Sequence, residues 1–288
     1  MNKKLTLLFK SILQGFAIVI GAVALALCLR IFVFDSYKIP SPSMEPSILS
    51  GDYVFVNKLI LGPRIYKNFD FMDGKKVETK RLPGLRKVKR NDILVFNFPY
   101  SNWNVLKMDL NAFYIKRCIA IPGDTFYIDH GIYKVKGCKD TLGSYRSQSE
   151  FYQQEYLSPV IFNTYPQDKV YNWNVKQFGP LYLPRAQDRI TIDTLNIRLY
   201  RKLIIYETDK DISVKGDTVF LGDQIFTSYV FKQNYYFMSG DNVYNSKDSR
   251  YWGPLPEDHI VGKAAFVWKS KDPVSNKYRF DRFFKAVR

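Results

Sequence analysis

Two side chains in this chain of 288 residues suggest nucleophilic chemistry that needs no histidine. Ser43 lies in the stretch IPSPSMEP, residues 39–46, shortly after a long apolar segment, and Lys116 lies downstream in YIKR, residues 114–117. A serine hydroxyl is a weak nucleophile until a base takes its proton, and a lysine serves as that base when burial lowers its pKa toward neutrality. Ser43 and Lys116 are therefore our candidates for a nucleophile and its general base.

The few histidines and cysteines limit the other chemistry. His130 and His259 are isolated in the sequence, which disfavours a Ser-His-Asp triad and a metal site built from histidines, so we expect no metal and no cofactor. Cys28 lies inside the apolar segment, which leaves Cys118–Cys138 as the one disulfide the chain can form internally. Two free, buried cysteines are an equally ordinary outcome.

The alternation around Lys116 indicates a strand with an apolar wall. In a strand, Lys116 shares one face with Tyr114, Cys118 and Ala120, while Arg117 points the other way toward solvent or a carboxylate. On spacing alone, a lysine in a strand is more often a solvated side chain than a base. The assignment of Lys116 therefore depends on the rest of the sequence.

An amino-terminal segment is long and apolar enough to cross a membrane. Residues 12–29 are apolar apart from Gln14, and a helix of this length rises about 27 Å, close to the thickness of the hydrocarbon core. Three lysines precede it, so the positive-inside rule places the amino terminus in the cytoplasm and everything after Arg30 outside. A cleaved signal peptide is the alternative, because residues 24–26 (ALA) resemble a cleavage site, but the apolar region is longer than usual.

The formal net charge of +16 is compatible with nucleic acid or with an anionic membrane surface as a partner. Basic residues are scattered among acidic ones, and the sequence has neither a zinc pattern nor a glycine-rich phosphate loop. With the apolar segment, these features favour the lipid bilayer, and we expect no nucleic-acid partner. The ending at residues 278–285 (YRFDRFFK) either rests on a membrane interface or is a solvated terminus with a few aromatic rings in the core.

The remaining sequence predicts a mainly β fold. Alternating and aromatic-rich runs bounded by turn residues predict strands at residues 53–56, 93–98, 114–121, 125–128, 132–135, 235–238 and 260–268. Between residues 137 and 229 the sequence is polar, tyrosine-rich and irregular, and we interpret it as a smaller β-rich lobe inserted into the first.

These patterns predict a single transmembrane helix followed by an antiparallel β-sheet catalytic domain. The predicted divisions are a cytoplasmic basic tail at 1–11, a membrane anchor at 12–34, a first part of the catalytic core at 35–136, the inserted lobe at 137–229, and a second part of the core with a basic aromatic tail at 230–288.

Four segments resemble the sequence boxes of bacterial type I signal peptidases. Residues 39–58 (IPSPSMEPSILSGDYVFVNK) resemble the nucleophile box, roughly PSxSMxPTLxxGD, and residues 90–96 (RNDILVF) resemble the RGDIVVF strand. Residues 114–124 (YIKRCIAIPGD) resemble the lysine box, YIKRxxGxPGD, and residues 240–253 (GDNVYNSKDSRYWG) resemble the last box, GDNxxNSxDSRxxG. Four boxes in the right order behind an amino-terminal anchor make the resemblance specific.

The resemblance implies roles for the site residues. Ser43 is expected to be the nucleophile and Lys116 the general base, which later returns the proton to the leaving amine. Ser246 is expected to hydrogen-bond and orient the Lys116 amine, and the Ser41 hydroxyl with the Ser43 backbone N–H to form the oxyanion hole. Supporting roles are implied for four further residues: Asp248 and Arg250 as an ion pair that braces the last box, Tyr114 against the Lys116 stem, and Met44 in the wall of the site.

Several positions depart from the family pattern, among them Ser47 in place of threonine and Ala120 in place of glycine, and three further departures bear on the site. Pro42 replaces the usual glycine before the nucleophile, which removes an N–H and restricts φ without touching the expected oxyanion donors. Asn91 replaces the glycine of RGD and needs a positive φ there. Val243-Tyr244 replaces a polar pair and is expected to change the packing of the loop around Ser246.

The implied function is that of a serine endopeptidase with a Ser-Lys dyad, anchored in the bacterial cytoplasmic (inner) membrane with its catalytic domain on the outer face. It would remove signal peptides from exported pre-proteins after small residues such as Ala-x-Ala, through an acyl-enzyme, as a monomer. A soluble Ser-Lys self-cleaving repressor is disfavoured by the span at 12–29, and a catalytically silent homologue by the intact Ser43, Lys116 and Ser246. A basic membrane-surface scaffold without chemistry would leave the four boxes unexplained.

Overall fold

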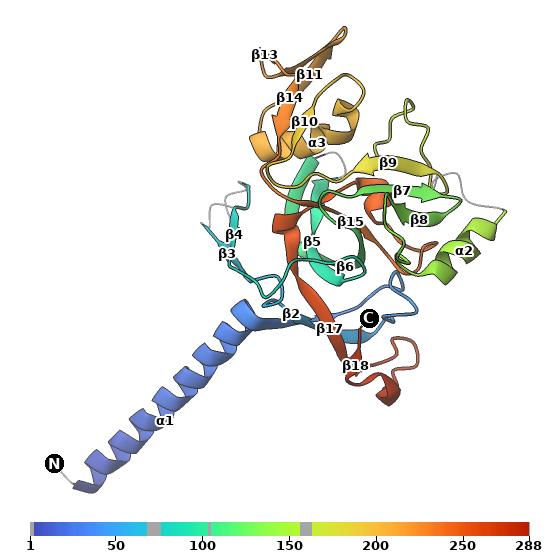
Figure 1. Ribbon diagram of the computed structural model, residues 1–288. Helices are drawn as coiled ribbons and strands as arrows, with labels where there is room; N and C mark the ends of the chain where they lie inside the picture. The colour runs from blue at the N-terminus through green and yellow to red at the C-terminus, as the bar shows by residue number, and fades with distance from the viewer. Residues whose placement is uncertain (1–2, 68–75, 103–104, 156–162, 288) are drawn as a thin grey trace.

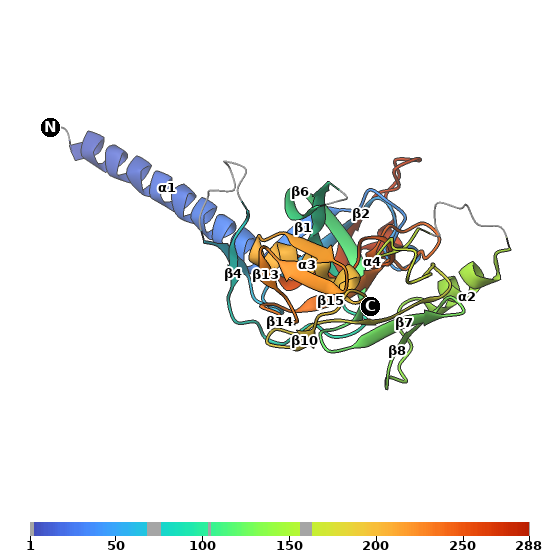
Figure 2. The ribbon, with the colours of Figure 1, turned by 90° about the horizontal axis from the view of Figure 1, so that it is seen from above.

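The first element is a long apolar helix that stands apart from the rest of the molecule. The computed structural model describes residues 3–67, 76–102, 105–155 and 163–287. Helix α1 (Lys3–Cys28) continues through a π-helical turn (Leu29–Val33) directly into strand β1 (Phe34–Lys38). In Figures 1 and 2, α1 projects away from the folded domain. Its segment Phe9–Val33 has a mean hydropathy of 2.7 and none of it is buried, so it matches the predicted anchor in length and composition.

An antiparallel sheet forms the centre of the domain. Among the described residues it has eight strands in the order β1-β2-β17-β5-β6-β15-β16, with β18 added to β17. The strands besides β1 are β2 (Asp52–Asn57), β5 (Ile93–Asn102), β6 (Val105–Ala120), β15 (Tyr235–Ser239), β16 (Leu255–Pro256), β17 (Ile260–Ser270) and β18 (Lys285–Ala286). Because β17 lies between β2 and β5, the carboxyl-terminal part of the chain is built into the centre of the sheet.

Smaller sheets and helices surround the central sheet. The small sheets pair β3 (Arg64–Tyr66) with β4 (Thr79–Arg81); β7 (Thr125–Asp129) with β8 (Ile132–Val135) and β9 (Phe178–Tyr182); β10 (Arg189–Thr191) with β14 (Ser228–Val230); and β12 (Thr218–Leu221) with β11 (Ile212–Lys215) and β13 (Gln224–Ile225). The helices after α1 are α2 (Tyr145–Gln153), α3 (Ile197–Thr208) and α4 (Ser249–Trp252), and there are 3-10 turns at Glu257–His259 and Phe280–Arg282.

The observed elements confirm the predicted fold class. Each strand expected from the sequence falls on an observed one, and the domain is built from antiparallel sheets behind a single apolar helix. In β2 the burial alternates, with Val54 and Val56 in the core and Tyr53 and Phe55 half-buried, which is the period that identifies such a strand in a sequence. The cysteines Cys118 and Cys138 are free, so the disulfide alternative is wrong.

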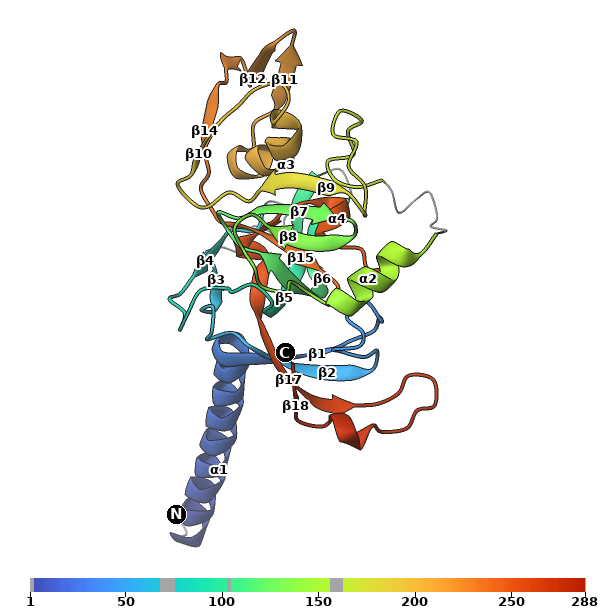
Figure 3. The same cartoon turned by 45° about the vertical axis from the view of Figure 1, so that its right-hand side comes forward.

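The segment predicted to be an inserted lobe contains helices as well as strands. Helices α2 and α3 both lie within residues 137–229, and α3 buries Leu203 and Ile204. In Figure 3, α3 and strands β10–β14 lie at the end of the molecule farthest from α1. Strand β9 pairs with β7, so one small sheet takes strands from both sides of position 137. The division at that position stays a prediction.

Two apolar clusters sandwich the middle of the central sheet. The larger contains Phe96, Ile119 and Phe237, together with most of the buried side chains of α3 and the small sheets. The smaller contains Met44 and Ile48 with buried residues of β2, β5 and β17. Fully burying one such side chain contributes roughly 1.5–3 kcal/mol, so Met44 and Ile48 hold the segment after β1 firmly against the sheet.

Candidate active site

Ser43 lies on a short loop that is closed at its base by backbone hydrogen bonds. We call residues 40–50 the Ser43 loop. The backbone N–H of Ile39 donates to Asp52 O over 2.8 Å, and the N–H of Gly51 donates back to Ile39 O over 2.8 Å. With its base paired and Met44 buried, the loop holds the Ser43 hydroxyl over the sheet, where the side chain is only 8% exposed.

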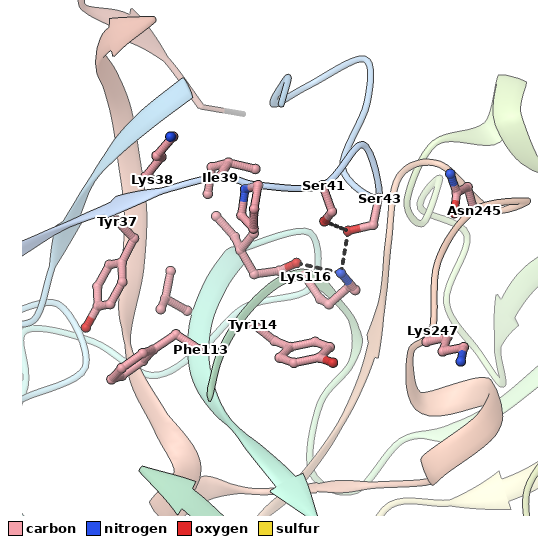
Figure 4. A pocket seen from close by; sticks show the side chains of 13 residues that line it. Tyr37, Lys38, Ile39, Ser41, Ser43, Phe113, Tyr114, Lys116, Asn245 and Lys247 are labelled. Atoms are coloured by element: carbon pink, nitrogen blue, oxygen red, sulfur yellow. Dashed lines mark hydrogen bonds between the residues drawn. The ribbon is translucent and has the colours of Figure 1, made fainter. Parts of the chain in front are cut away.

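Lys116 reaches Ser43 from strand β6. Its Nζ donates to Ser43 Oγ over 2.6 Å and to the carbonyl oxygen of Ile115 over 3.0 Å (Figure 4). Lys116 is 3% exposed, and this burial lowers its pKa from 10.5 to about 8, against the opposing effects of Asp248 and Asp241. A lysine in this state loses its proton close to neutral pH, which is the property that a general base requires.

Two predicted neighbours, Ser41 and Tyr114, lie close to this pair, while the third, Met44, is packed in the smaller apolar cluster and does not line the cleft. Ser41 Oγ lies 3.4 Å from Ser43 Oγ, and Figure 4 shows both hydroxyls on the side of the loop that faces Lys116. The ring centroid of Tyr114 lies 5.6 Å from Lys116 Nζ. The Met44 side chain is fully buried directly after Ser43. The loop and β6 thus bring together the residues that the sequence separates into two boxes.

The segment after β15 forms the other wall of the site. An added Cβ on Gly240 would lie 2.3 Å from Ser246 Oγ and 2.4 Å from Ser43 O, so this position accepts only glycine without a shift. Asn242 donates its backbone N–H to Ser43 O over 3.1 Å and its side-chain amide to Pro42 O over 3.2 Å. The sequence analysis gave Asn242 no role, although its place in the last box was a signal for one.

Ser246 lies beside Ser43 but does not make the hydrogen bond to the Lys116 amine that the resemblance implies. Ser246 is 6% exposed, and within the described residues its Oγ makes no hydrogen bond of good geometry, although it lies close enough to the Asp248 carboxylate to help lower the pKa of that group. The two hydrogen bonds of the Lys116 amine go to Ser43 and Ile115. The orienting bond from Ser246 to Lys116 is therefore not formed in this arrangement, and that role of Ser246 stays a prediction.

Asp248 and Arg250 form a fully buried ion pair. Arg250 Nε lies 2.8 Å from Asp248 Oδ1 and Nη2 lies 2.9 Å from Oδ2, and Arg250 Nη2 also donates to the carbonyls of Val243 and Ser246. Burial alone raises the pKa of Asp248, but the Arg250 charge and hydrogen bonds, with the Gly240 N–H, hold it below its usual range. The pair therefore stays charged and fixes the backbone around Ser246.

Two departures from the family pattern have a structural explanation. Asn91 has a φ of 68°, the left-handed conformation that glycine usually provides, as expected from the sequence. At the Val243-Tyr244 pair, Val243 is buried and its N–H donates to Ser147 Oγ of α2 over 3.1 Å, while Tyr244 is 55% exposed. The apolar Val243 therefore packs into the core beneath α2.

Arg117, the neighbour of Lys116, points to the opposite side of β6. It donates to Asp241 through Nε over 2.7 Å and through Nη2 over 2.6 Å, and both side chains are almost fully buried. The expected carboxylate partner is thus present, and it belongs to the last box, residues 240–253. Asp241, like Asn242, carried no assignment from the sequence.

The dyad opens into a cleft of about 440 Å³. Figure 4 shows Tyr37 and Phe113 at one side of the cleft and Asn245 and Lys247 at the other, with Ser43 and Lys116 between them. The lining is mostly apolar and comes from β1, the Ser43 loop, β5, β6 and the last box: Tyr37, Lys38, Ile39, Pro40, Ser41, Ser43, Val95, Phe113, Tyr114, Ile115, Lys116, Asn245 and Lys247.

Comparison with known proteins identifies the family. The family model described as signal peptidase, peptidase S26, matches residues 12–269. The chain belongs to this signal peptidase family. All four sequence boxes, with Ser43, Lys116 and Ser246, lie inside the matched segment.

Curated relatives named signal peptidase I come from several bacteria. The relative from Buchnera aphidicola subsp. Acyrthosiphon pisum is 30% identical over 96% of this chain and 80% of its own length. The relative from Aquifex aeolicus is 28% identical over 91% of this chain and 84% of its own length. The relative from Pseudomonas aeruginosa is 27% identical over 90% of this chain and 73% of its own length. The similarity therefore extends over the anchor and the folded domain together.

Proposed function

We propose that this chain is a membrane-anchored serine endopeptidase that removes signal peptides from exported pre-proteins. The observation that carries the proposal is the 2.6 Å hydrogen bond between Lys116 Nζ and Ser43 Oγ at a buried position. Burial lowers the Lys116 pKa to about 8, so roughly a tenth of the lysine is neutral at pH 7, far more than for a solvated lysine. Membership in the signal peptidase family supplies the reaction class.

The reaction begins with attack by Ser43. Its Oγ attacks the carbonyl carbon of the scissile peptide bond while Lys116 Nζ takes the hydroxyl proton, and the lysinium then gives that proton to the leaving amine. Cleavage of the C–N bond leaves an ester between Ser43 and the signal peptide. Neutral Lys116 next takes a proton from water, the resulting hydroxide attacks the ester, and the proton returns to Ser43 Oγ as the ester C–O bond breaks.

The surrounding residues have supporting roles in this proposal. The Ser41 hydroxyl, 3.4 Å from Ser43 Oγ, and the Ser43 backbone N–H stabilise the oxyanion of the tetrahedral intermediate. Ser246 orients the Lys116 amine once Ser43 is acylated and no longer accepts its hydrogen bond. Tyr114 keeps water from the lysine, Met44 holds the Ser43 loop against the sheet, and the Asp248–Arg250 pair braces the Ser246 loop.

The cleft and the anchor together suggest how a substrate binds. An extended peptide adds to the strand edges beside Ser43, and the apolar lining from Ile39 and Ile115 accepts small side chains before the scissile bond. The signal helix of the pre-protein lies in the same bilayer as α1, which raises the effective concentration of the two partners. We place the amino terminus in the cytoplasm and the cleft on the outer face of the inner membrane, with the enzyme acting as a monomer and without a nucleic-acid partner.

Processing of a labelled pre-protein in proteoliposomes tests the proposal. Wild-type protein should release the signal peptide, whereas Ser43→Ala and Lys116→Ala should reduce the rate by at least about 1000-fold, because the nucleophile or its base is lost. Lys139→Ala, which removes an exposed lysine, should leave the rate unchanged. Near-normal processing by Lys116→Ala would show that the dyad is wrongly assigned.

A further inference from the structure

The carboxyl-terminal tail contacts the Ser43 loop although it lies beyond the segment that the family model matches. We define the tail as residues 271–287; the family match ends at residue 269. After β17 the chain turns through the 3-10 turn at Phe280–Arg282 and returns to β17 as β18. Figure 3 shows this return beside β17 and β2, on the side of the domain near β1. The tail is thus adjacent to the base of the Ser43 loop.

Arg282 makes the central contact between the tail and the loop. Its Nε donates to Asp52 Oδ1 over 3.0 Å, and its Nη2 donates to Asp52 Oδ2 over 2.5 Å and to Ser47 O over 3.2 Å. Asp52 is fully buried, Arg282 is 5% exposed, and Asp52 Oδ2 also accepts the Leu49 N–H over 2.8 Å. The Arg282 guanidinium therefore connects Ser47, in the second half of the Ser43 loop, to Asp52, the first residue of β2.

Two further contacts join the tail to the end of the loop. Arg279 Nη2 donates to Ser50 O over 2.5 Å, and the Lys271 N–H donates to Gly51 O over 3.1 Å. The backbones approach so closely that a Cβ on Gly51, which has a φ of 89°, would lie 2.0 Å from Lys271 O. The tail and the loop are therefore packed backbone against backbone as well as through side chains.

The tail is one of three supports that reach the Ser43 loop from different parts of the chain. Asn242 holds the carbonyls of Pro42 and Ser43, and Arg117 Nη2 lies 3.3 Å from Ser47 Oγ. Of these three supports, the tail alone lies outside the matched family segment. A reacting atom that must approach a carbonyl at a defined angle depends on such supporting contacts, and a displacement of 1 Å can cost about 100-fold in rate.

We propose that the tail is a positioning element for Ser43 and that Arg282 is its principal positioning residue. The proposal rests on the nucleophilic role proposed above for Ser43. Arg282 acts through Asp52 and Ser47, whose positions determine the course of the loop between Met44 and β2. Its loss shifts the Ser43 hydroxyl relative to Lys116 and to the scissile bond, which lowers kcat. The part of the cleft lining that comes from β1, β5, β6 and the last box is not moved, so KM changes much less than kcat.

The test compares Arg282→Gln with Arg282→Lys in the full-length protein. Arg282→Gln should lower kcat for a labelled pre-protein by about 10- to 100-fold with KM within about twofold of wild type. Arg282→Lys keeps the charge without the two-pronged geometry and should recover part of the rate. Leu203→Ala, which removes a buried side chain of α3, is the control for lost stability and should lower Tm without changing kcat below Tm.

Three outcomes decide whether the tail positions Ser43. A fall in kcat for Arg282→Gln but not for Leu203→Ala, measured well below both Tm values, supports the proposal. Wild-type kcat for Arg282→Gln overturns it and leaves the tail a purely stabilising element. If Arg282→Gln does not fold, the same two results are assessed with Arg282→Lys and with Arg279→Gln. The Arg279 change removes the hydrogen bonds to Ser50 O and Ser270 Oγ and weakens the ion pairs with Asp52 and Asp272, while it leaves the Arg282 contacts in place. Ser43→Ala in the same assay tests the proposed nucleophile itself. Normal turnover by Ser43→Ala would refute the proposed function, whereas normal turnover by Arg282→Gln alone would refute only the tail proposal.

Discussion

The guanidinium of Arg117 and the carboxylate of Asp241 form a buried, two-pronged ion pair directly behind the lysine of the candidate dyad. Lys116 and Arg117 are consecutive on β6, so one side chain faces the cleft while the next holds the loop that carries Asn242. Asn242 in turn binds the backbone of Pro42 and Ser43. Two consecutive residues of β6 therefore act on opposite sides of the strand: Lys116 contacts Ser43, the proposed nucleophile, and Arg117 holds the segment that supports the backbone of Ser43.

The first prediction concerns this pair. Asp241→Ala leaves the Arg117 charge buried without its carboxylate, so we expect a loss of about 3–5 kcal/mol in the free energy of unfolding. Denaturant unfolding measures the loss. The double variant Arg117→Ala with Asp241→Ala should lose less than the sum of the two single changes, and simple additivity would contradict the pairing.

The second prediction concerns the pH dependence of the reaction. Because burial lowers the Lys116 pKa to about 8, kcat/KM should rise with pH through about 8 and reach a plateau well below 10.5, the ordinary lysine pKa. Steady-state kinetics on a soluble peptide substrate between pH 6 and pH 10 measures this profile. A profile that still climbs at pH 10 would mean that the base is a solvated lysine.

The third prediction concerns the free energy of unfolding, which the burial of Lys116 lowers. A lysine whose pKa is lower in the folded state binds fewer protons there than when unfolded, so stability should increase between about pH 8 and 10.5. Below about pH 8 the cost is fully present and is on the order of 3 kcal/mol, because the Lys116 pKa falls from 10.5 to about 8 on folding. Lys116→Met should therefore be inactive yet more stable than wild type at pH 7.

Denaturant unfolding at pH 7 and at pH 10 checks this expectation. The gain from Lys116→Met should shrink at the higher pH, where the wild-type lysine is largely neutral in the folded state. The matched control is Lys139→Met, an exposed lysine for which no pH-dependent gain is expected. Equal stability of Lys116→Met and wild type at pH 7 would be evidence against a desolvated amine.

The fourth prediction concerns the oxyanion. Ser41→Ala removes the hydroxyl 3.4 Å from Ser43 Oγ and should lower kcat by about 100- to 1000-fold with little change in KM, the usual cost of one oxyanion donor. Ser50→Ala removes a serine from the same loop whose hydroxyl binds Pro40 O, and it should be nearly neutral. Equal effects of the two changes would point to loop stability rather than transition-state stabilisation.

The fifth prediction uses the close approach at Gly240. The Cβ of Gly240→Ala would lie 2.3 Å from Ser246 Oγ and 2.4 Å from Ser43 O, so both residues must move apart. Because the nucleophile is displaced, we expect kcat to fall by about 100-fold or more. The control is Gly15→Ala in α1, where an added Cβ meets nothing within 4 Å. Normal turnover by Gly240→Ala would show that the site tolerates this movement.

Local patterns in the sequence predicted the anchor and the main strands, whereas the choice of Ser43 and Lys116 also required the resemblance of four boxes to a known family. Each of these depends on residues close together in the chain or on a box of fixed spacing. Helix α3 was missed even though Ile197, Tyr200, Leu203 and Ile204 follow a helical period, because the surrounding prolines and polar residues drew the interpretation toward irregular β-structure.

The contacts that hold the site could not be predicted in the same way. Arg282 and Asp52 are 230 positions apart, and nothing local to either residue identifies its partner. The bonding of the Lys116 amine and of Ser246 depends on side-chain positions fixed by three separate segments, which no spacing in the sequence specifies. Pairings of this kind follow from the strand order, in which β17 is inserted between β2 and β5.

The direct passage from the anchor into the sheet has a further consequence. Strand β1 begins at Phe34, the residue that follows the apolar span, and the cleft lining begins at Tyr37. In the membrane topology proposed above, so short a connection would keep Ser43 and Lys116 at a set height above the lipid. The anchor would then determine the distance between the membrane and the site of cleavage. Among several peptide bonds of similar sequence, the enzyme would cut the one that the substrate's own helix presents at that distance.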